Sequence, residues 1–296
     1  GRVNDPRIRG VVRAKGARIE SATTGTVLTG VEATGTFNGS QLSFSNFAAD
    51  AGKGGRVTGS GSFDFADVNG FGIDLKLQTD KAVMINRDDI AATVTGPMTI
   101  HSSGAGGVIA GDLVLNASRY RLGQAVSATA VPQLNIREIN LPDDTGIEDS
   151  RQREPWTLDV RARASNGLRV NGLGLTSEWT ADLQIGGAPD NPAIAGRADI
   201  IRGTYEFSGR QFDIDRGVIR FGGETPANPV IDISANADST GLSASIQVTG
   251  PATRPEINFS SVPALPQDEL LSRLLFGTSI TNLSAPEALQ LAAAVA

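Results

Sequence analysis

Side chains that could support acid–base, nucleophilic or metal chemistry are scarce in this sequence. The only histidine, His101, is followed by Ser102 and Ser103, and there is no cysteine. The absence of cysteine excludes thiol catalysis, cysteine-ligated zinc and disulfide bonds. A single histidine beside two serines is more typical of a surface position than of a catalytic one, so His101 is not a candidate for catalysis.

Aspartate pairs are the other candidates, because two carboxylates can bind a divalent cation. Asp213 and Asp215 are two residues apart, which is the spacing of the polar face of a strand, so a solvated face explains them better. Two more pairs are adjacent and typical of turns, with side chains that point apart in an extended chain: Asp88 with Asp89, and Asp143 with Asp144. No phosphate-binding loop, serine-nucleophile motif or zinc spacing occurs. We therefore expect no enzyme activity, no metal and no cofactor.

Composition places the chain among folded proteins. Of its 296 residues, 40% are hydrophobic, which is sufficient for a packed structure. The 32 aspartates and glutamates outnumber the 26 lysines and arginines, and the net charge of −6 argues against nucleic-acid binding. No apolar run reaches the roughly 20 residues that a membrane-spanning helix needs. The chain begins at Gly1 and ends within a helical pattern, so we expect it to be a piece of a longer protein.

Alternation of apolar and polar residues is the dominant pattern. It is typical of strands with one apolar and one polar face, and it is clearest at residues 73–78, 158–164, 179–185, 231–235 and 242–249. Asn-Gly pairs, which favour tight hairpin turns, begin at residues 38, 69, 166 and 171. The sequence therefore predicts an all-β fold, an antiparallel meander of roughly 18–20 strands.

The period changes near the C-terminus. From Pro266 onward leucines recur at helical spacing, and Gly277 is suited to cap the C-terminus of that helix. Ser284 and Glu287 have the spacing of a capping box, which opens a second helix. We therefore expect short helices after the last strand.

The apolar face of such a sheet must be covered or used. No helical layer is available before residue 266, so the sheet could fold into a sandwich, curl into a trough or dimerise. Only 5% of the residues are aromatic, fewer than a tightly filled core of this size would use, which favours a trough. A trough would suit acyl chains, because burying one CH₂ group is worth roughly 0.8 kcal/mol and a chain of about 16 carbons could gain about 10 kcal/mol.

Residues 167–277 resemble the C-terminal region of the TamB family. Three motifs carry this resemblance jointly: R-G-T-Y at residues 202–205, F-x-x-x-x-G-x-I-x-F at residues 212–221, and L-L-x-x-L-L-F-G at residues 270–277. The helix that opens at Ser284 belongs to the same pattern, whereas residues 1–137 share its style with weaker motifs.

The resemblance implies a fold, a location and two roles. Members of this family form a long sheet that curls into a β-taco, a trough with an apolar groove. An N-terminal helix, which we expect outside this chain, anchors them in the inner membrane of Gram-negative bacteria, and the sheet crosses the periplasm. Their C-terminal end meets the outer-membrane barrel TamA. They are linked to the assembly of outer-membrane proteins and autotransporters and to phospholipid movement between the membranes.

We expect four segments and two sets of site residues. The segments are residues 1–137 (first part of the trough), 138–155 (a polar exposed excursion), 156–262 (the TamB-like β-taco) and 266–296 (amphipathic helices). The predicted lipid-binding groove comprises Leu158, Val160, Leu183, Ile185, Tyr205, Phe207, Phe212, Ile214, Ile231, Ile233, Ile246, Val248, Ile257 and Phe259. The predicted partner-binding helix presents Leu270, Leu271, Leu274, Leu275 and Phe276.

Two functional hypotheses follow. In the first, the groove carries phospholipid acyl chains between the inner and outer membranes and supports outer-membrane protein assembly with a TamA-like barrel. In the second, the chain is a chaperone or scaffold that holds unfolded outer-membrane clients by β-augmentation, without lipid transport. The hairpin signals argue against an adhesin with a β-helix, and 2 Trp and 2 Tyr are too few for the aromatic girdles of an outer-membrane barrel.

Overall fold

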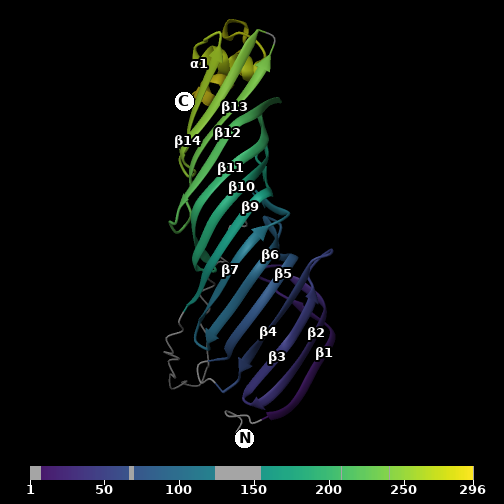
Figure 1. The fold of residues 1–296 in the computed structure, drawn as a ribbon. Helices are drawn as coiled ribbons and strands as arrows, with labels where there is room; N and C mark the ends of the chain where they lie inside the picture. Colours follow the sequence, from purple (N-terminus) through teal and green to yellow (C-terminus); the bar gives the residue numbers. More distant parts are fainter. Residues whose placement is uncertain (1–7, 67–69, 124–154, 208, 240, 296) are drawn as a thin grey trace, which may run out of the picture. The chain divides into compact units, whose positions relative to one another are not determined.

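The computed structural model of the chain describes residues 8–66, 70–123, 155–207, 209–239 and 241–295. Fifteen strands form one sheet, in which β1 to β7 and then β9 to β15 follow one another as neighbours, while β8 pairs with β6 and β9 (Figure 1). The ladders from β1 to β7 and from β11 to β15 are antiparallel. The predicted all-β meander is confirmed.

The strands have the following bounds: β1 (Ile8–Glu20), β2 (Val27–Gly39), β3 (Gln41–Asp50), β4 (Arg56–Asp64), β5 (Gly72–Asn86), β6 (Ile90–Ser103), β7 (Gly107–Leu115), β8 (Ser118–Arg121), β9 (Trp156–Gly172), β10 (Leu175–Ala188), β11 (Asn191–Phe207), β12 (Arg210–Gly222), β13 (Val230–Ser239), β14 (Leu242–Pro251) and β15 (Glu256–Val262).

The described strands are fewer and longer than the turn signals predicted. The expectation of roughly 18–20 strands is wrong for the described residues, which contain fifteen, and β9 and β11 have 17 residues each. The Asn-Gly pair at 166–167, predicted as a hairpin turn, lies inside β9, where Gly167 takes a φ of 82° without ending the strand. The pair at 38–39 does end β2, as predicted.

The chain divides into two compact units. The first comprises Gly1–Ala162 with Gln184–Pro192, and the second comprises Arg163–Leu183 with Ala193–Ala296. Strands β9, β10 and β11 therefore contribute to both units. The predicted excursion at 138–155 lies outside the described residues except for Pro155, so its exposure stays a prediction.

The sheet of the first unit is curled, and the curl closes at one end. The Asn86 amide donates a hydrogen bond to the Thr24 carbonyl (2.8 Å), and the Thr26 hydroxyl donates to the Met84 carbonyl (2.5 Å). These bonds join the turn before β2 to the end of β5, although β3 and β4 lie between the two strands in the sheet. Strong twist and coiling of the sheet make this possible.

Small side chains fill the closed end. Thr79 has no exposed surface, and its hydroxyl donates to the Gly96 carbonyl (2.9 Å), which satisfies the buried polar group. The other buried side chains at this end are small or medium aliphatic ones: Val31, Ala49, Ala51, Val57, Ala82 and Val94. The closed end is thus a packed core.

The sheet of the second unit is also curled. The rings of Phe207 on β11 and Phe259 on β15 lie 6.3 Å apart, although three strands separate β11 from β15 in the sheet. Trp179 fills the interior with 1% of its surface exposed, and its indole N–H donates to the Ser177 hydroxyl (2.8 Å). A Cβ on Gly217 would lie 3.0 Å from the Trp179 ring, so glycine leaves the room that the indole occupies.

Two short α-helices follow β15. They are α1 (Gln267–Phe276) and α2 (Ala285–Val295), with a 3-10 helix η1 (Ile280–Asn282) between them. Among the described residues, no helix is both long and apolar enough to cross a membrane.

The predicted helix caps are confirmed. The backbone at Gly277 is left-handed (φ 72°), and its N–H donates to the Arg273 carbonyl (3.1 Å) at the end of α1. The Ser284 amide donates to the Glu287 carboxylate (2.8 Å), which is the reciprocal bond of a capping box before α2.

Candidate apolar groove and its helical cover

Apolar side chains of neighbouring strands stand in rows across one face of the first unit. The registers of β2 to β5 align Phe37, Leu42, Phe63 and Ile73 in one row. The next row, two residues along each strand, comprises Gly35, Phe44, Gly61, Leu75, Ile100 and Ile109. Side chains two residues apart share a face of the sheet, so both rows lie on one face. The second row is apolar from β2 to β7, whereas the first ends at β5, because Ser102 on β6 faces Ile73.

Six phenylalanines cluster on this face, from Phe47, which packs against the core of the closed end, along the strands away from that end. We call the cluster the phenylalanine end; its rings form contacts with centroids 5.4–6.4 Å apart, and its members are Phe37, Phe44, Phe47, Phe63, Phe65 and Phe71. Phe71 is 60% exposed and the others are half-buried. The described residues of this unit contain no helix that could cover the cluster.

Glycines on β4 make room for the large side chains of β5. A Cβ on Gly59 would lie 2.7 Å from the Leu77 Cδ2 atom, and one on Gly61 would lie 2.8 Å from the Leu75 Cδ2 atom. The two leucines therefore lie directly over the backbone of β4. Glycine at these two positions leaves the room that the two leucine side chains occupy.

The second unit has matching rows on β12 to β15. The registers align Ile214, Ala235, Ile246 and Phe259 in one row. Tyr205 on β11 pairs with Phe212 on β12 in the adjacent row. The strand pattern of the phenylalanine end is therefore repeated here, mostly with aliphatic side chains.

Helix α1 covers this second apolar face. Leu270 and Leu274 of α1 pack in one cluster with Phe212, Ile214 and Ile246. The exposed fractions of these three sheet residues are 0%, 8% and 5%. Full burial of such a side chain is worth about 1.5–3 kcal/mol, so apolar contact is the main force that holds α1 on the sheet.

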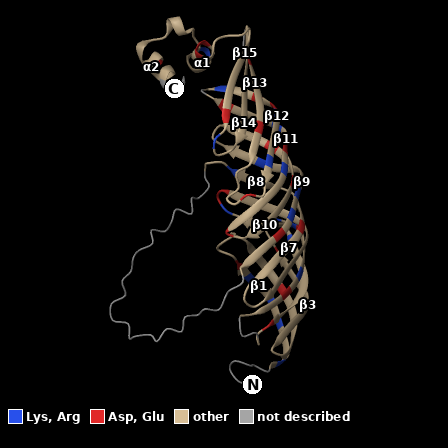
Figure 2. Ribbon diagram, turned by 90° about the vertical axis from the view of Figure 1, so that its left-hand side faces the viewer, with Lys and Arg blue, Asp and Glu red and all other residues tan. Residues whose placement is uncertain are grey.

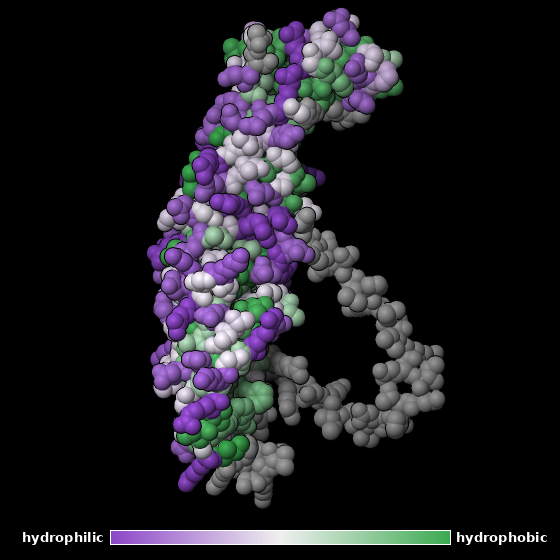
Figure 3. Space-filling view, turned by 90° about the vertical axis from the view of Figure 1, so that its right-hand side faces the viewer, coloured by the Kyte–Doolittle hydropathy of each residue, from purple (hydrophilic) through white to green (hydrophobic). Residues whose placement is uncertain are grey.

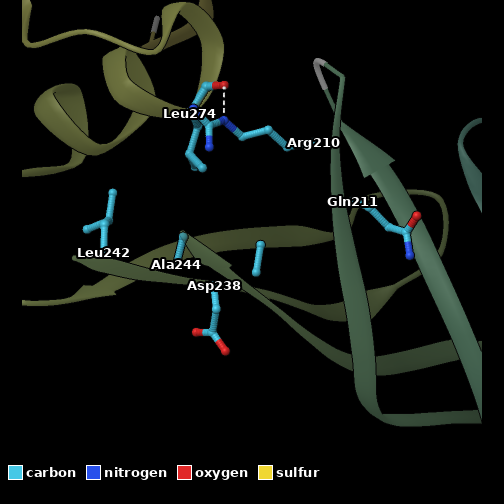
Figure 4. A pocket seen from close by; sticks show the side chains of 7 residues that line it. Arg210, Gln211, Asp238, Leu242, Ala244 and Leu274 are labelled. Carbon is cyan, nitrogen blue, oxygen red and sulfur yellow. Dashed lines mark hydrogen bonds between the residues drawn. The ribbon is translucent and has the colours of Figure 1, made fainter. Parts of the chain in front are cut away.

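Arg210 fixes the C-terminal end of α1, and the sequence analysis did not single it out. Its Nε donates to the Leu274 carbonyl (3.2 Å) and its Nη2 donates to the Arg273 carbonyl (3.1 Å), as Figure 4 shows for Leu274. A cation at a helix C-terminus also interacts favourably with the helix dipole. Arg210 lies two residues before Phe212 on β12, so the strand alternation already placed it on the apolar face.

A cavity of about 210 Å³ lies between α1 and the sheet. Its lining combines Arg210 with apolar side chains of the sheet and of α1, among them Leu242, Ala244 and Leu274. Asp238 also lines it, but its carboxylate points away from α1 (Figure 4). Arg210 is therefore the charged group that reaches from the sheet to the helix here.

A model of the TamB C-terminal domain family matches residues 45–296. The chain belongs to the TamB family. This confirms the resemblance, and the match begins well before residue 167, where the quoted motifs start. A curated relative from Haemophilus influenzae (strain ATCC 51907 / DSM 11121 / KW20 / Rd), "Translocation and assembly module subunit TamB", is 28% identical over 129 residues, which are 42% of this chain. The aligned part is 10% of that relative's length, so the chain matches a small part of it.

The predicted groove residues of this TamB domain lie in different surroundings. Ile257, on the last strand β15, is 51% exposed. Leu158, Val160 and Ile185 belong to the first unit and are half-buried, as are Leu183 and Ile231 of the second unit. The remaining residues belong to the cluster that α1 covers: Tyr205, Phe207, Phe212, Ile214, Ile233, Ile246, Val248 and Phe259. Three of them, Phe212, Ile214 and Ile246, are buried in one core with Leu270 and Leu274 of α1, and the other five are half-buried beside it. Contact of all eight with lipid stays a prediction.

The leucines of the predicted partner-binding helix lie against the chain itself. Leu270, Leu271 and Leu274 are 0%, 4% and 3% exposed, while Leu275 and Phe276 are half-buried. The first three are therefore not on an accessible face, because α1 uses its apolar side to cover the sheet. Partner binding by this set stays a prediction, and as α1 lies it could involve only the half-buried side chains.

Glu269 ties α1 to the segment that follows it in this TamB domain. Its carboxylate accepts hydrogen bonds from the Ile280 amide (2.9 Å), the Arg273 Nε (2.6 Å) and the Ser279 hydroxyl (3.0 Å). These bonds, with that from Ile280 foremost, hold the pKa of Glu269 below its ordinary value. The carboxylate therefore fixes η1 against α1 in its ionised form.

The polar faces of the strands carry ion pairs. Arg202 pairs with Glu178 (2.6 Å) and Arg216 pairs with Asp232 (2.5 Å), and the bond from Arg202 lowers the pKa of Glu178. Figure 2 shows acidic and basic residues spread along the strands, and the face in Figure 3 is largely hydrophilic with scattered apolar residues. Such exposed pairs contribute about 0–1 kcal/mol each, so they serve solvation more than stability.

Residues that could do chemistry are dispersed in the described part of the chain. It contains no group of three or more His, Cys, Asp or Glu side chains that could hold a metal ion. His101 is exposed on β6, Asp213 is exposed on β12, and the neighbouring Asp215 accepts a hydrogen bond from the Asn236 amide. The apolar side chains, in contrast, are aligned in rows on one face of the sheet, so the apolar face is the candidate functional surface.

Proposed function

We propose that this TamB domain binds phospholipid acyl chains along its apolar face and conducts them between the inner and outer membranes. The observation that supports the proposal most strongly is the apolar row that runs from β2 to β7, beside a second row from β2 to β5 that contributes to the half-buried phenylalanine end. An apolar face that is both continuous and partly exposed is unusual for a soluble domain and marks a binding surface.

The energy of such binding needs no head-group pocket. Each CH₂ group removed from water contributes roughly 0.8 kcal/mol, so an acyl chain lying along the rows would gain several kcal/mol from contact alone. The head group would remain in water at the rim, beside the polar faces. Because successive rows repeat the same surface, a chain could move from row to row without a large barrier.

The setting of this activity is also part of the proposal. The relative's name describes a subunit of a translocation and assembly module, and we infer that this chain works in the periplasm in such a module with a TamA-like outer-membrane barrel. Lipid delivered to the outer membrane would support the insertion of outer-membrane proteins and autotransporters. The domain would act there without catalysis.

A second candidate function rests on β1. Among the described strands, β2 is the one neighbour of β1 in the sheet, and Ile8, Val11 and Val12 of β1 are 46%, 55% and 44% exposed. A free strand edge with exposed apolar side chains is able to add a strand from another polypeptide. The edge would thus hold an unfolded outer-membrane client in the absence of lipid transport.

Site-specific photocrosslinking in cells distinguishes the two. A photoreactive amino acid at Phe44 or Leu75 should form lipid adducts, whereas one at Ser43 or Lys76, on the opposite face, should form few. Protein adducts at Val11 without lipid adducts at Phe44 would favour the client-holding function. Equal lipid adducts on both faces would rule out the apolar face as the lipid path.

A further inference from the structure

Helix α1 occupies the surface that an acyl chain would need in the second unit. Leu270 and Leu274 lie on the cluster of Phe212, Ile214 and Ile246, so α1 and a lipid cannot use this surface together. The cavity of about 210 Å³ is also smaller than the roughly 300–1,000 Å³ of usual ligand pockets. It has room for the end of a chain while α1 is docked, but a whole lipid requires that α1 leave.

Among the described residues, the hydrogen bonds from the sheet to α1 come from Arg210, which makes two. Arg210 donates to the carbonyls of Arg273 and Leu274, which are neutral acceptors at the helix end. A phosphodiester is an anion that accepts two parallel N–H bonds from a guanidinium, and charged acceptors bind roughly twice as strongly as neutral ones. A phosphate beside the cavity would therefore compete effectively for Arg210.

We propose that α1 is a displaceable cover of the apolar face, with Arg210 as its latch, and that a phospholipid opens it. The acyl chain takes the place of Leu270 and Leu274 while the phosphate takes the Arg210 guanidinium from the helix carbonyls. Both parts of the lipid contribute, because an acyl chain alone must break the Arg210 bonds without replacing them and a phosphate alone leaves the apolar contact intact. This inference rests on the proposed lipid-binding function and adds its regulation and the chemistry of the head group.

Distance measurement between spin labels tests the proposal on the whole chain, which has no native cysteine. Cysteines at Gln267 on α1 and Gln247 on β14, both exposed, carry the labels. Vesicles of dioleoylphosphatidylcholine should shift a growing fraction of molecules to a longer distance. Dioleoylglycerol, which has the same acyl chains without the phosphodiester, should need about tenfold more for the same fraction, and inorganic phosphate alone should have no effect.

Variants of Arg210 separate a latch from a merely structural role. Arg210→Gln should lower the dioleoylglycerol needed for half-displacement, because the bonds to the helix are gone, and raise the phosphatidylcholine needed, because its phosphate loses its partner. The ratio between the two lipids should then come close to one. Arg210→Lys keeps the charge but lacks the planar guanidinium, so its ratio between the two lipids should fall between those of the native chain and of Arg210→Gln. Arg220→Gln, an exposed arginine on the same strand, is the matched control and should change nothing. Circular dichroism establishes that each variant retains its strands.

The outcomes distinguish failure of the cover from failure of the groove. If α1 stays docked while lipid adducts form at Phe44, the cover proposal is overturned and the lipid-binding proposal stands. If dioleoylglycerol and phosphatidylcholine displace α1 equally well in the native chain, Arg210 is not a phosphate-sensitive latch. If neither displacement nor adducts at Phe44 occur, lipid binding itself fails.

Discussion

The phenylalanine end of the first unit and the α1-covered face of the second are built from the same strand pattern but differ in their cover. In both, apolar side chains of adjacent strands align in rows by their registers. At the phenylalanine end Phe44 and Phe63 are half-buried, whereas Phe212 under α1 has no exposed surface. Alternation thus specifies an apolar face, and a separate element decides whether that face is a core or a groove.

The difference also appears in the side chains that form the two faces. The phenylalanine end combines large rings with glycines such as Gly35 and Gly61, which gives a broad floor that needs no covering layer. The covered face uses Ile214, Ala235 and Ile246, which interdigitate with leucines of a helix. Close packing of this second kind is what makes a core sensitive to substitution.

The largest expected effect comes from placing a charge in α1. Leu270→Asp buries a carboxylate at a position with no exposed surface, which costs several kcal/mol, so α1 should leave the sheet. The second unit should then resemble the phenylalanine end and bind a hydrophobic dye. Hydrogen exchange of residues 267–276 measures the release, and Gln267→Asp, at an exposed position, is the control. Continued protection of α1 in Leu270→Asp would show that the two faces do not differ as described.

A smaller effect is expected when one phenylalanine of each face is truncated and the loss in free energy of unfolding is compared. Phe212→Ala should destabilise the second unit by about 3–5 kcal/mol, whereas Phe63→Ala should cost the first unit about 1–2 kcal/mol, because its ring is only half-buried. Urea unfolding followed by tryptophan fluorescence checks this, since Trp156 lies in the first unit and Trp179 in the second. Trp156→Phe and Trp179→Phe backgrounds isolate each signal. Equal losses at both positions would argue that the phenylalanine end is also a closed core.

A charge in the groove should affect binding more than folding. Leu75→Arg places a guanidinium in the row that runs from Gly35 to Ile109. Because the position is half-buried, the long side chain can reach water, so the free energy of unfolding should fall by only about 1 kcal/mol. Lipid adducts at Phe44 should fall strongly, while the urea midpoint changes little. Gln78→Arg, on the polar face of the same strand, is the control and should leave the adducts unchanged.

The smallest effect concerns pH. The lowered pKa of Glu269 stabilises the link between α1 and η1 above the ordinary pKa of glutamate, and this contribution is lost as the pH falls through the lowered value. Exchange protection of the Ile280 amide should therefore decrease in acid below that ordinary value. Glu269→Gln should remove this pH dependence. An unchanged titration in the variant would mean that another group controls the link.

Local features were predictable from the sequence, because they depend on nearby residues. The alternation predicted the strands, and Gly277 and the Ser284–Glu287 pair predicted the helix caps. The hairpin turn predicted at Asn166-Gly167 was wrong, because a glycine with positive φ can also be accommodated inside a strand.

Tertiary features were harder to predict. The docking of α1 depends on contacts between residues 212–246 and 270–274, which no local pattern specifies. Arg210 is two residues before Phe212, so the alternation places it on the apolar face of β12. A basic side chain is more typical of the polar face, so its type and its position point to different faces. The phenylalanine end was missed because β3 contains a bulge between Phe44 and Phe47, which breaks the alternation there.

Quenching by brominated phospholipid tests most directly whether one face is open to acyl chains and the other covered. With Trp156 and Trp179 replaced by phenylalanine, single tryptophans at Phe63 and Phe212 report on the two faces, and circular dichroism verifies the strands. At low lipid concentration, before α1 is displaced, quenching should be strong for the tryptophan at Phe63 and weak for the one at Phe212. Equal quenching at both positions, or none at Phe63, would contradict this account.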